Sequence, residues 1–205
     1  MTRPGSQAEA VPDAVAAAEA GADVIVAQGS EGGGHVGVMS SLTLVPMVVD
    51  AVAPVPVIAA GGIADGRGLA AAVALGALGA LLGTRFLATS ESPLPAWAKQ
   101  AILDSDGHDT DLTEIPDLIS ETVWPGAFAR VWRNQLIRNW SGREWEVRAR
   151  AREIAAEVNE ARAKGDAQGV PLLFGQDAGL IRSIEPAGDV IARMVQDAAA
   201  ILGRR

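Results

Sequence analysis

Residues 23–37 read Asp-Val-Ile-Val-Ala-Gln-Gly-Ser-Glu-Gly-Gly-Gly-His-Val-Gly, an apolar run followed directly by a glycine-rich loop. The run from Val24 to Ala27 is short, continuous and rich in β-branched residues, which predicts a strand buried on both faces of a parallel sheet. Five of the ten residues at 28–37 are glycine. Glycine is costly unless the backbone approaches another group closely or takes positive φ. The stretch therefore predicts a parallel strand whose carboxyl end carries a binding loop.

The same pattern of apolar strand, glycine turn and helix recurs twice before Ser90. We predict strands at 23–28, 56–60 and 80–83. We predict helices at 14–20, 43–52 and 66–75, the second capped by Thr43 and the third by Asp65. Short strands that alternate with helices of about ten residues indicate βαβ units, and hence an α/β fold with a parallel sheet.

Composition divides the chain into three parts. Residues 1–90 hold the βα units, and 91–165 form a helical insertion in which 126–164 are one or two long helices. Residues 166–205 form a C-terminal segment that ends in an amphipathic helix from Asp189 to Leu202. The apolar face of that helix is predicted to consist of Ile191, Met194, Val195, Ala198 and Leu202.

Composition also excludes several classes of function. The chain has 205 residues and no cysteine, so disulfides, thiolate metal sites and thiol catalysis are excluded. Its net charge of −8 argues against a nucleic-acid surface, and the basic stretch 143–152 alternates with glutamates as a solvated helix face does. No uninterrupted apolar run is long enough to cross a membrane, and residues 1–10 lack the pattern of a signal peptide. We therefore expect a cytoplasmic protein.

Glycine turns follow the other two predicted strands as well. Gly61-Gly62 follows the second strand and Gly83-Thr84 follows the third. Parallel strands place their carboxyl ends at one edge of the sheet, and barrels bind phosphate there through loop amides. We therefore predict a phosphate-binding cradle at this edge, with His35 at its mouth. An imidazole in that position can take up a proton or, when charged, stabilise an anion.

These motifs together resemble those of the nitronate monooxygenases (2-nitropropane dioxygenases). The resemblance is close and ordered through 20–37, 56–67 and Leu82-Gly83-Thr84-Arg85-Phe86 with Glu91-Ser92. It continues more weakly through Arg133-Asn134-Gln135 and the tail at 175–181. The resemblance implies an enzyme that uses FMN and oxidises an alkyl nitronate or nitroalkane with O2 to a carbonyl compound and nitrite.

The resemblance also implies roles for particular residues. Carried over by position, His35 is the catalytic residue, acting as base on a substrate α-carbon or orienting the anionic nitronate. Gln28 and Gly33 contact the flavin, and Gly62 with the segment 81–84 holds its phosphate. The full set of expected cofactor-binding residues is Gln28, Gly33, Gly34, Gly61, Gly62, Leu81, Leu82, Gly83 and Thr84. No metal site is expected.

The same motifs leave alternatives open. Gly33-Gly34-His35 and Asn134-Gln135-Leu136 also resemble the FMN-dependent enoyl-ACP reductases, although Gln28-Gly29 is more like the monooxygenases. Gly32 departs from the alanine that is common in the monooxygenases, which would loosen the loop. Barrels that resemble IMP dehydrogenase share the phosphate turns but need a catalytic cysteine, which this chain lacks. An inactive fragment of a flavin barrel is the remaining alternative.

Other polar and aromatic residues have structural interpretations. His108 is predicted at the surface, Glu31 as a solvated loop carboxylate, and Arg85 either near phosphate or paired with a carboxylate. We predict a solvated loop for the acidic cluster of Asp104, Asp106, Asp109 and Asp111. No glycine-turned calcium loop surrounds this cluster. Most tryptophans are predicted to pack the insertion against the barrel, and a wall over the flavin is the alternative for Trp124 or Trp132.

A complete (β/α)8 barrel takes about 250 residues, and the resemblance identifies the three predicted strands as the last three of eight. The expected fold is a partial TIM-type barrel whose exterior is completed by 166–205. Three parallel strands leave two unpaired edges. We therefore expect the chain to pair with another copy as a homo-oligomer, to cover the gap with its long helices, or to be unstable alone. The missing strands would come from an upstream gene start or from another chain, unless the gene is a remnant.

Overall fold

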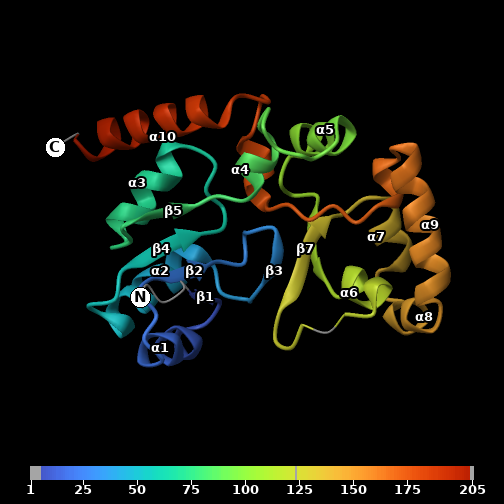
Figure 1. Cartoon of the computed structure of the whole chain (residues 1–205), viewed down its shortest axis with the longest axis horizontal. Coiled ribbons are helices and arrows are strands. Elements are labelled where there is room, and N and C mark those ends of the chain that lie inside the picture. Colours follow the sequence, from blue (N-terminus) through green and yellow to red (C-terminus); the bar gives the residue numbers. More distant parts are fainter. Residues whose placement is uncertain (1–5, 123, 204–205) are drawn as a thin grey trace.

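Four parallel strands form the central sheet of the computed structural model, which describes residues 6–122 and 124–203 (Figure 1). In spatial order they are β1 (Ser6–Ala8), β2 (Ile25–Gln28), β4 (Val57–Ala60) and β5 (Gly79–Leu81). The three predicted strands are present, but the number three is wrong because β1 pairs with β2, Ser6 opposite Ile25. β1 escaped prediction because it is three residues long and begins with polar Ser6 and Gln7, so it lacks the apolar run that marks the other strands.

Three helices lie between consecutive strands of this sheet. They are α1 (Val11–Glu19), α2 (Ser41–Val52) and α3 (Gly66–Ala74). The predicted cap of α3 is confirmed, since the Asp65 carboxylate accepts hydrogen bonds from two backbone amides of the first turn. The predicted start of α2 at Thr43 is wrong. Ser40 is the last extended residue and the helix begins at Ser41, so Thr43 lies inside the first turn.

The central sheet is packed against α1 and α2 by an apolar core. Ile25 and Ala27 from β2 and Ala59 from β4 are all fully or almost fully buried there. Leu44 and Val48 from α2 cover them. On the other face of the strands Val26 and Ile58 are only half-buried, so the prediction of burial on both faces is confirmed in full only for the helix-covered face.

A second, antiparallel sheet lies beside the first and was not predicted. Its order is β3 (Gly34–Val36), β7 (Phe128–Trp132) and β6 (Thr110–Thr113). The prediction of helix across 126–164 is therefore wrong at β7. The partner of β7 is β3, which is part of the glycine-rich loop and lies almost a hundred residues earlier, with His35 opposite Ala129. A pairing between such distant segments leaves no local pattern in the sequence.

Outside β6 and β7, the regular structure of the insertion is helical. Its helices are α5 (Ala96–Asp104), α6 (Ile115–Ser120), α7 (Gln135–Trp140), α8 (Glu144–Ala149) and α9 (Ala151–Lys164), and the short helix α4 (Thr84–Leu87) precedes it. The helices α8 and α9 pack on α6, in a cluster that includes Ile137 and Ile154. They do not cover the strand edges, so that expectation is wrong. Within the described residues, β1 and β5 remain the edge strands of the central sheet.

The C-terminal segment contains two short 3-10 turns, Ala167–Gly169 and Gln176–Leu180, and the final helix α10 (Ala187–Leu202). This helix packs on α3. Its buried residues are Val190, Met194 and Ala198. The predicted apolar face is therefore confirmed for Met194 and Ala198 and wrong for Ile191, Val195 and Leu202, which are exposed.

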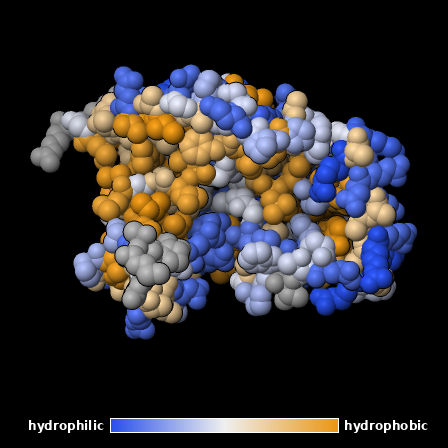
Figure 2. Space-filling view, viewed as in Figure 1, coloured by the Kyte–Doolittle hydropathy of each residue, from blue (hydrophilic) through white to orange (hydrophobic). Residues whose placement is uncertain are grey.

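Apolar side chains are exposed to solvent at the β5 edge of the central sheet. Leu78, just before β5, is 74% exposed, and Leu81 at its end is 47% exposed. Figure 2 shows apolar residues gathered over the region of α3 and β5.

Among the described residues, no helix is both long enough and apolar enough to cross a membrane.

Candidate functional site

The carboxyl ends of the central strands surround a cavity of about 150 Å³. The residues that line it are Gln28, Gly32, Gly33, Ala60, Gly61, Gly62, Ile63, Leu81, Gly83, Thr84 and Asp177. Seven of the nine expected cofactor-binding residues are therefore brought together. The other two, Gly34 and Leu82, do not line the cavity, and the Leu82 side chain packs against the core of the sheet instead.

The backbone of the second turn has the geometry that only glycine tolerates well. Gly61 and Gly62 have φ of +90° and +75°. A Cβ on Gly61 would also lie 2.7 Å from the carbonyl oxygen of Gly29. Across the cavity, a Cβ on Gly83 would meet nothing within 4 Å. The loops are therefore close to one another at Gly61 and open at Gly83.

The amides around this cavity suit an anion. In the described part of the chain, neither the Gly62 nor the Gly83 amide donates to a backbone acceptor. The first-turn amides of α3 are not available, because the Asp65 carboxylate already accepts from Arg67 and Gly68. Free loop amides bind phosphate oxygens well. The cavity is smaller than the roughly 300–1,000 Å³ of most ligand pockets, so it has room for an anion of phosphate size and not for a ring system.

Asp177 brings a carboxyl group into the same cavity, and sequence reasoning did not single it out. It is 5% exposed. Burial raises the pKa of Asp177 to about 6, although a hydrogen bond from Thr84 and the charge of Arg85 oppose the rise. Asp177 lies in the tail 175–181 that carried part of the resemblance, but its nearness to Thr84 depends on the fold.

The C-terminal tail closes directly over the glycine-rich loop. The backbone amide of Gly175 donates to Thr84 Oγ1 at 2.8 Å, and that of Gln176 donates to the carbonyl oxygen of Glu31 at 2.9 Å. A Cβ on Gly33 would lie 2.5 Å from the backbone of Phe174. Close approach of the protein's own tail is therefore one reason for a glycine at 33.

His35 lies on β3, next to the cavity and outside its lining. The side-chain amide of Gln28 donates to the His35 carbonyl oxygen at 3.0 Å, which links the cavity wall to β3. The imidazole Nε2 is 2.8 Å from Asp117 Oδ1. The ring also stacks on Trp124, with centroids 4.2 Å apart and planes 17° from parallel. Asp117 was missed because α6 lies 82 residues away along the chain.

A buried arginine fastens the glycine-rich loop to the second sheet. Arg130 on β7 donates from Nε to the Ser30 carbonyl oxygen at 2.6 Å and from Nη1 to Thr110 Oγ1 at 3.1 Å. Burial lowers the pKa of Arg130, an effect that the charge of Glu31 opposes. The interpretation of Glu31 as a solvated carboxylate is wrong, since its oxygens accept from the amide and hydroxyl of Ser41.

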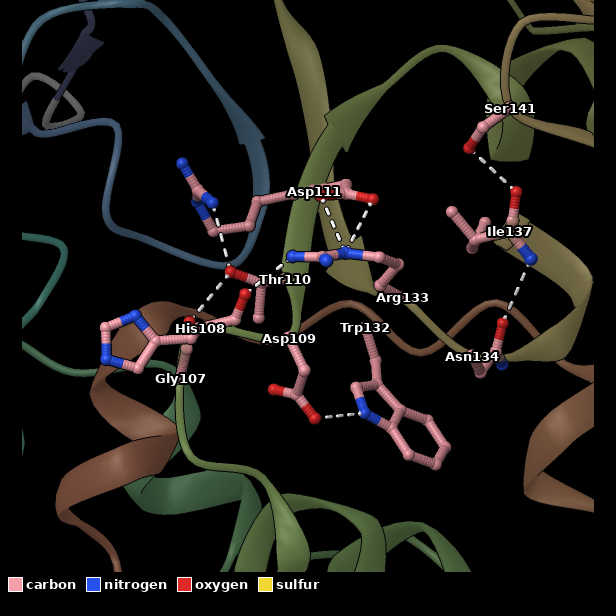
Figure 3. Close-up of polar contacts among 11 residues, drawn as sticks. Gly107, His108, Asp109, Thr110, Asp111, Trp132, Arg133, Asn134, Ile137 and Ser141 are labelled. Carbon is pink, nitrogen blue, oxygen red and sulfur yellow. Dashed lines mark hydrogen bonds and ion pairs between the residues drawn. The ribbon is translucent and has the colours of Figure 1, made fainter.

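The acidic cluster is tied into the second sheet rather than solvated throughout (Figure 3). Asp109 accepts from Trp132 Nε1 at 2.7 Å, and Asp111 pairs with Arg133 at 3.0 Å. The prediction of a solvated loop is therefore wrong for these two carboxylates. His108 is exposed, as predicted. Among the described residues, no three potential ligand side chains gather as a metal site.

Arg85 forms no ion pair with a carboxylate among the described residues, and its predicted place near phosphate stays a prediction. Its guanidinium is buried and donates to the carbonyl oxygens of Ala88 and Ser183 at 2.7 and 2.8 Å.

The tryptophans differ in how deeply they are packed and in what they pack against. Trp132 packs in a cluster that joins the insertion to residues such as Ala64 and Ala88, as predicted, whereas Trp140 packs within the insertion itself. Trp124 and Trp145 are 52% and 73% exposed.

Comparisons with known proteins match nearly the whole chain. The model of the family described as nitronate monooxygenase matches residues 5–197. A nitronate monooxygenase of Neurospora crassa is 36% identical over 203 residues, which are 94% of this chain and 53% of that protein. The chain spans about half the length of the curated relatives that match most of it.

Two solved structures also match nearly the whole chain. FabK from Thermotoga maritima is 35% identical with a TM-score of 0.84, and the match covers 97% of this chain and 61% of that one. A nitroalkane oxidase from Streptomyces ansochromogenes is 32% identical with a TM-score of 0.81, and the match covers 97% of this chain and 59% of that one.

Proposed function

The chain belongs to the nitronate monooxygenase family, and on this premise we propose that it oxidises alkyl nitronates with O2, using FMN, to a carbonyl compound and nitrite. The observation that carries the proposal is the glycine-rich loop. One side of this loop lines the anion-suited cavity through Gln28 and Gly33, and the other presents His35 on β3. A cofactor site and a proton-transferring group therefore share one short segment.

We propose that the cavity holds the phosphate of FMN. The amides of Gly62 and Gly83 would donate to phosphate oxygens, and the Thr84 hydroxyl lies beside them. Gln28 and Gly33 would lie next to the rest of the cofactor. When bound, FMN supplies the electron transfer and oxygen chemistry that no side chain can provide.

His35 would act on the substrate. Its imidazole can take a proton from the α-carbon of a neutral nitroalkane, or pair as a cation with a nitronate anion. The ring is only partly exposed, with 20% of its side-chain surface accessible, so a proton or charge on it is partly shielded from water.

We also infer that the central sheet is part of a TIM-type barrel. The solved relatives extend well beyond the region that this chain covers. The edge strand β5 ends in the exposed Leu81 and is preceded by the exposed Leu78. Exposed apolar residues at a strand edge are expected where further strands, or another copy of the chain, would pack. Helices α3 and α10 then form part of the exterior.

The proposal is tested with the purified full chain. We expect it to bind added FMN and to release nitrite from a nitronate in air. A chain that takes up no flavin would refute the cofactor assignment. Flavin binding with NAD(P)H consumption on a crotonyl thioester, and no nitrite, would favour an enoyl reductase instead.

His35→Asn tests the role of the histidine. We expect nitrite release to fall about 100-fold or more, the usual contribution of general acid–base catalysis, with FMN affinity changed far less. His108→Asn is the matched control, because His108 is the other histidine of the chain and is exposed. Equal losses of turnover and of FMN affinity in His35→Asn would show that His35 is structural.

A further inference from the structure

Residues of β7, α6 and the loop between them hold His35, one through its backbone and two through its imidazole. Its backbone is paired with β7, opposite Ala129. Its Nε2 edge faces Asp117 Oδ1 at 2.8 Å. Its flat face lies on the Trp124 ring. In Figure 1 this segment, from β6 through α6 to β7, is beside β3 and apart from the central sheet.

Asp117 is placed for this contact by its own helix. The α6 neighbours Ile115 and Ile119 are buried in the cluster with α7 and α9. The Asp117 side chain is 12% exposed and faces away from that apolar cluster toward His35. An acidic side chain is rarely this buried unless it is paired. The position of the carboxylate is therefore set by a core that is separate from the core of the central sheet.

The contact determines which imidazole nitrogen carries the proton. A carboxylate only accepts hydrogen bonds, so Nε2 must be the protonated nitrogen of the neutral ring. Nδ1 is then left with a free lone pair, and this is the atom able to take up a proton. When the ring becomes charged, the same carboxylate stabilises the cation, as the third member of a catalytic triad does.

We propose that Asp117 is a positioning residue for His35, fixing its tautomer and the direction of its ring; the inference rests on the catalytic role proposed for His35. Trp124 supports the same arrangement from the ring face. Asp117 is not among the residues that line the proposed cofactor cavity. We therefore expect its effect on catalysis to pass through the imidazole that it contacts.

The first test reads the tautomer directly and needs no turnover. The chain has only two histidines, so the imidazole nitrogens of a ¹⁵N-labelled sample can be assigned by comparison with His108→Asn. In the neutral ring we expect His35 to show a protonated Nε2 and a bare Nδ1, with little averaging. In Asp117→Asn, where the amide can donate as well as accept, we expect a mixture of tautomers. An unchanged tautomer population would overturn the proposal.

The second test separates positioning from folding. Asp117→Asn should lower kcat for nitrite release at least about tenfold, with FMN affinity and KM close to those of the natural chain. Asp117→Glu, which restores an acceptor, should recover part of the loss. The control is Asp111→Asn, in the same segment but paired with Arg133; it should leave both kcat and the His35 spectrum unchanged.

The outcomes distinguish the two proposals. If the chain releases no nitrite but the Asp117→Asn spectrum changes, the proposed function fails and the positioning of His35 stands. If nitrite release in Asp117→Asn stays within twofold of the natural chain, Asp117 does not position a catalytic group. If Asp117→Asn does not fold, Asp117→Glu carries the test, and a Glu variant with a free, averaged His35 ring would count against the proposal.

Discussion

Replacing the buried carboxyl group at the cavity should change how stability depends on pH. Burial raises the pKa of Asp177 from 3.8 to about 6 in the folded chain, so folding favours the protonated form. A rise in pKa from 3.8 to about 6 is equivalent to about 3 kcal/mol of folding free energy. This amount destabilises the fold at pH 8, where the carboxyl must be ionised, and is relieved as the pH falls through 6 toward 4.

Asp177→Asn removes the ionisation and keeps the shape. We expect the variant to be more stable than the natural chain at pH 8, by up to about 3 kcal/mol if the amide satisfies the same hydrogen bonds. At pH 5, one unit below the folded pKa, this advantage should shrink by about 1.4 kcal/mol, because the natural chain is then largely protonated at this site. Urea unfolding at pH 5, 6, 7 and 8 would measure both values.

A second carboxylate gives a control of opposite sign. Hydrogen bonds from Arg193 and Ser183 lower the pKa of Glu185 to about 2. Glu185→Gln should therefore lose stability across this whole pH range rather than gain it. A stability difference between Asp177→Asn and the natural chain that is the same at pH 5 and pH 8 would refute the reasoning. Loss of stability at pH 8 would show that the amide introduced at position 177 lacks partners.

Two further substitutions test how the glycine-rich loop is held. Gly33→Ala should cost about 1–3 kcal/mol of unfolding free energy, because its Cβ would meet the backbone of Phe174 at 2.5 Å. Gly188→Ala is the control, because its Cβ would meet nothing within 4 Å. Equal stabilities of the two variants in urea would contradict the contact with Phe174. Arg130→Met should cost about 2 kcal/mol by removing a charged hydrogen bond to Ser30. Amide hydrogen exchange across the loop should then become faster, and unchanged exchange would show that Arg130 does not fasten it.

The central sheet and its cavity follow closely from local sequence. Continuous apolar runs predicted β2, β4 and β5, and the glycines that follow them predicted the turns that line the cavity. Asp65 was recognisable as a cap from its place before α3. These features are readable because a strand inside a sheet and a turn with positive φ each restrict residue type at consecutive positions.

The antiparallel sheet and the residues around His35 were not predictable in this way. β7 pairs with β3 across almost a hundred residues, and a single such strand carries no periodic signal of its partner. Asp117 is one carboxylate among several in its segment until α6 brings it to the imidazole. Asp177 is similar, since only the closure of the tail over the loop buries it beside Thr84.

The sequence alone therefore determined three of the four parallel strands, the order of the glycine turns and the histidine on the loop, because each depends on neighbours along the chain. Only the tertiary structure decided which groups act on that loop. Arg130 holds its backbone, Asp117 and Trp124 hold its histidine, and the tail brings Asp177 to its cavity. Hydrogen bonding, stacking and desolvation depend on distances in space, and those distances are set by packing between segments that the sequence does not place side by side.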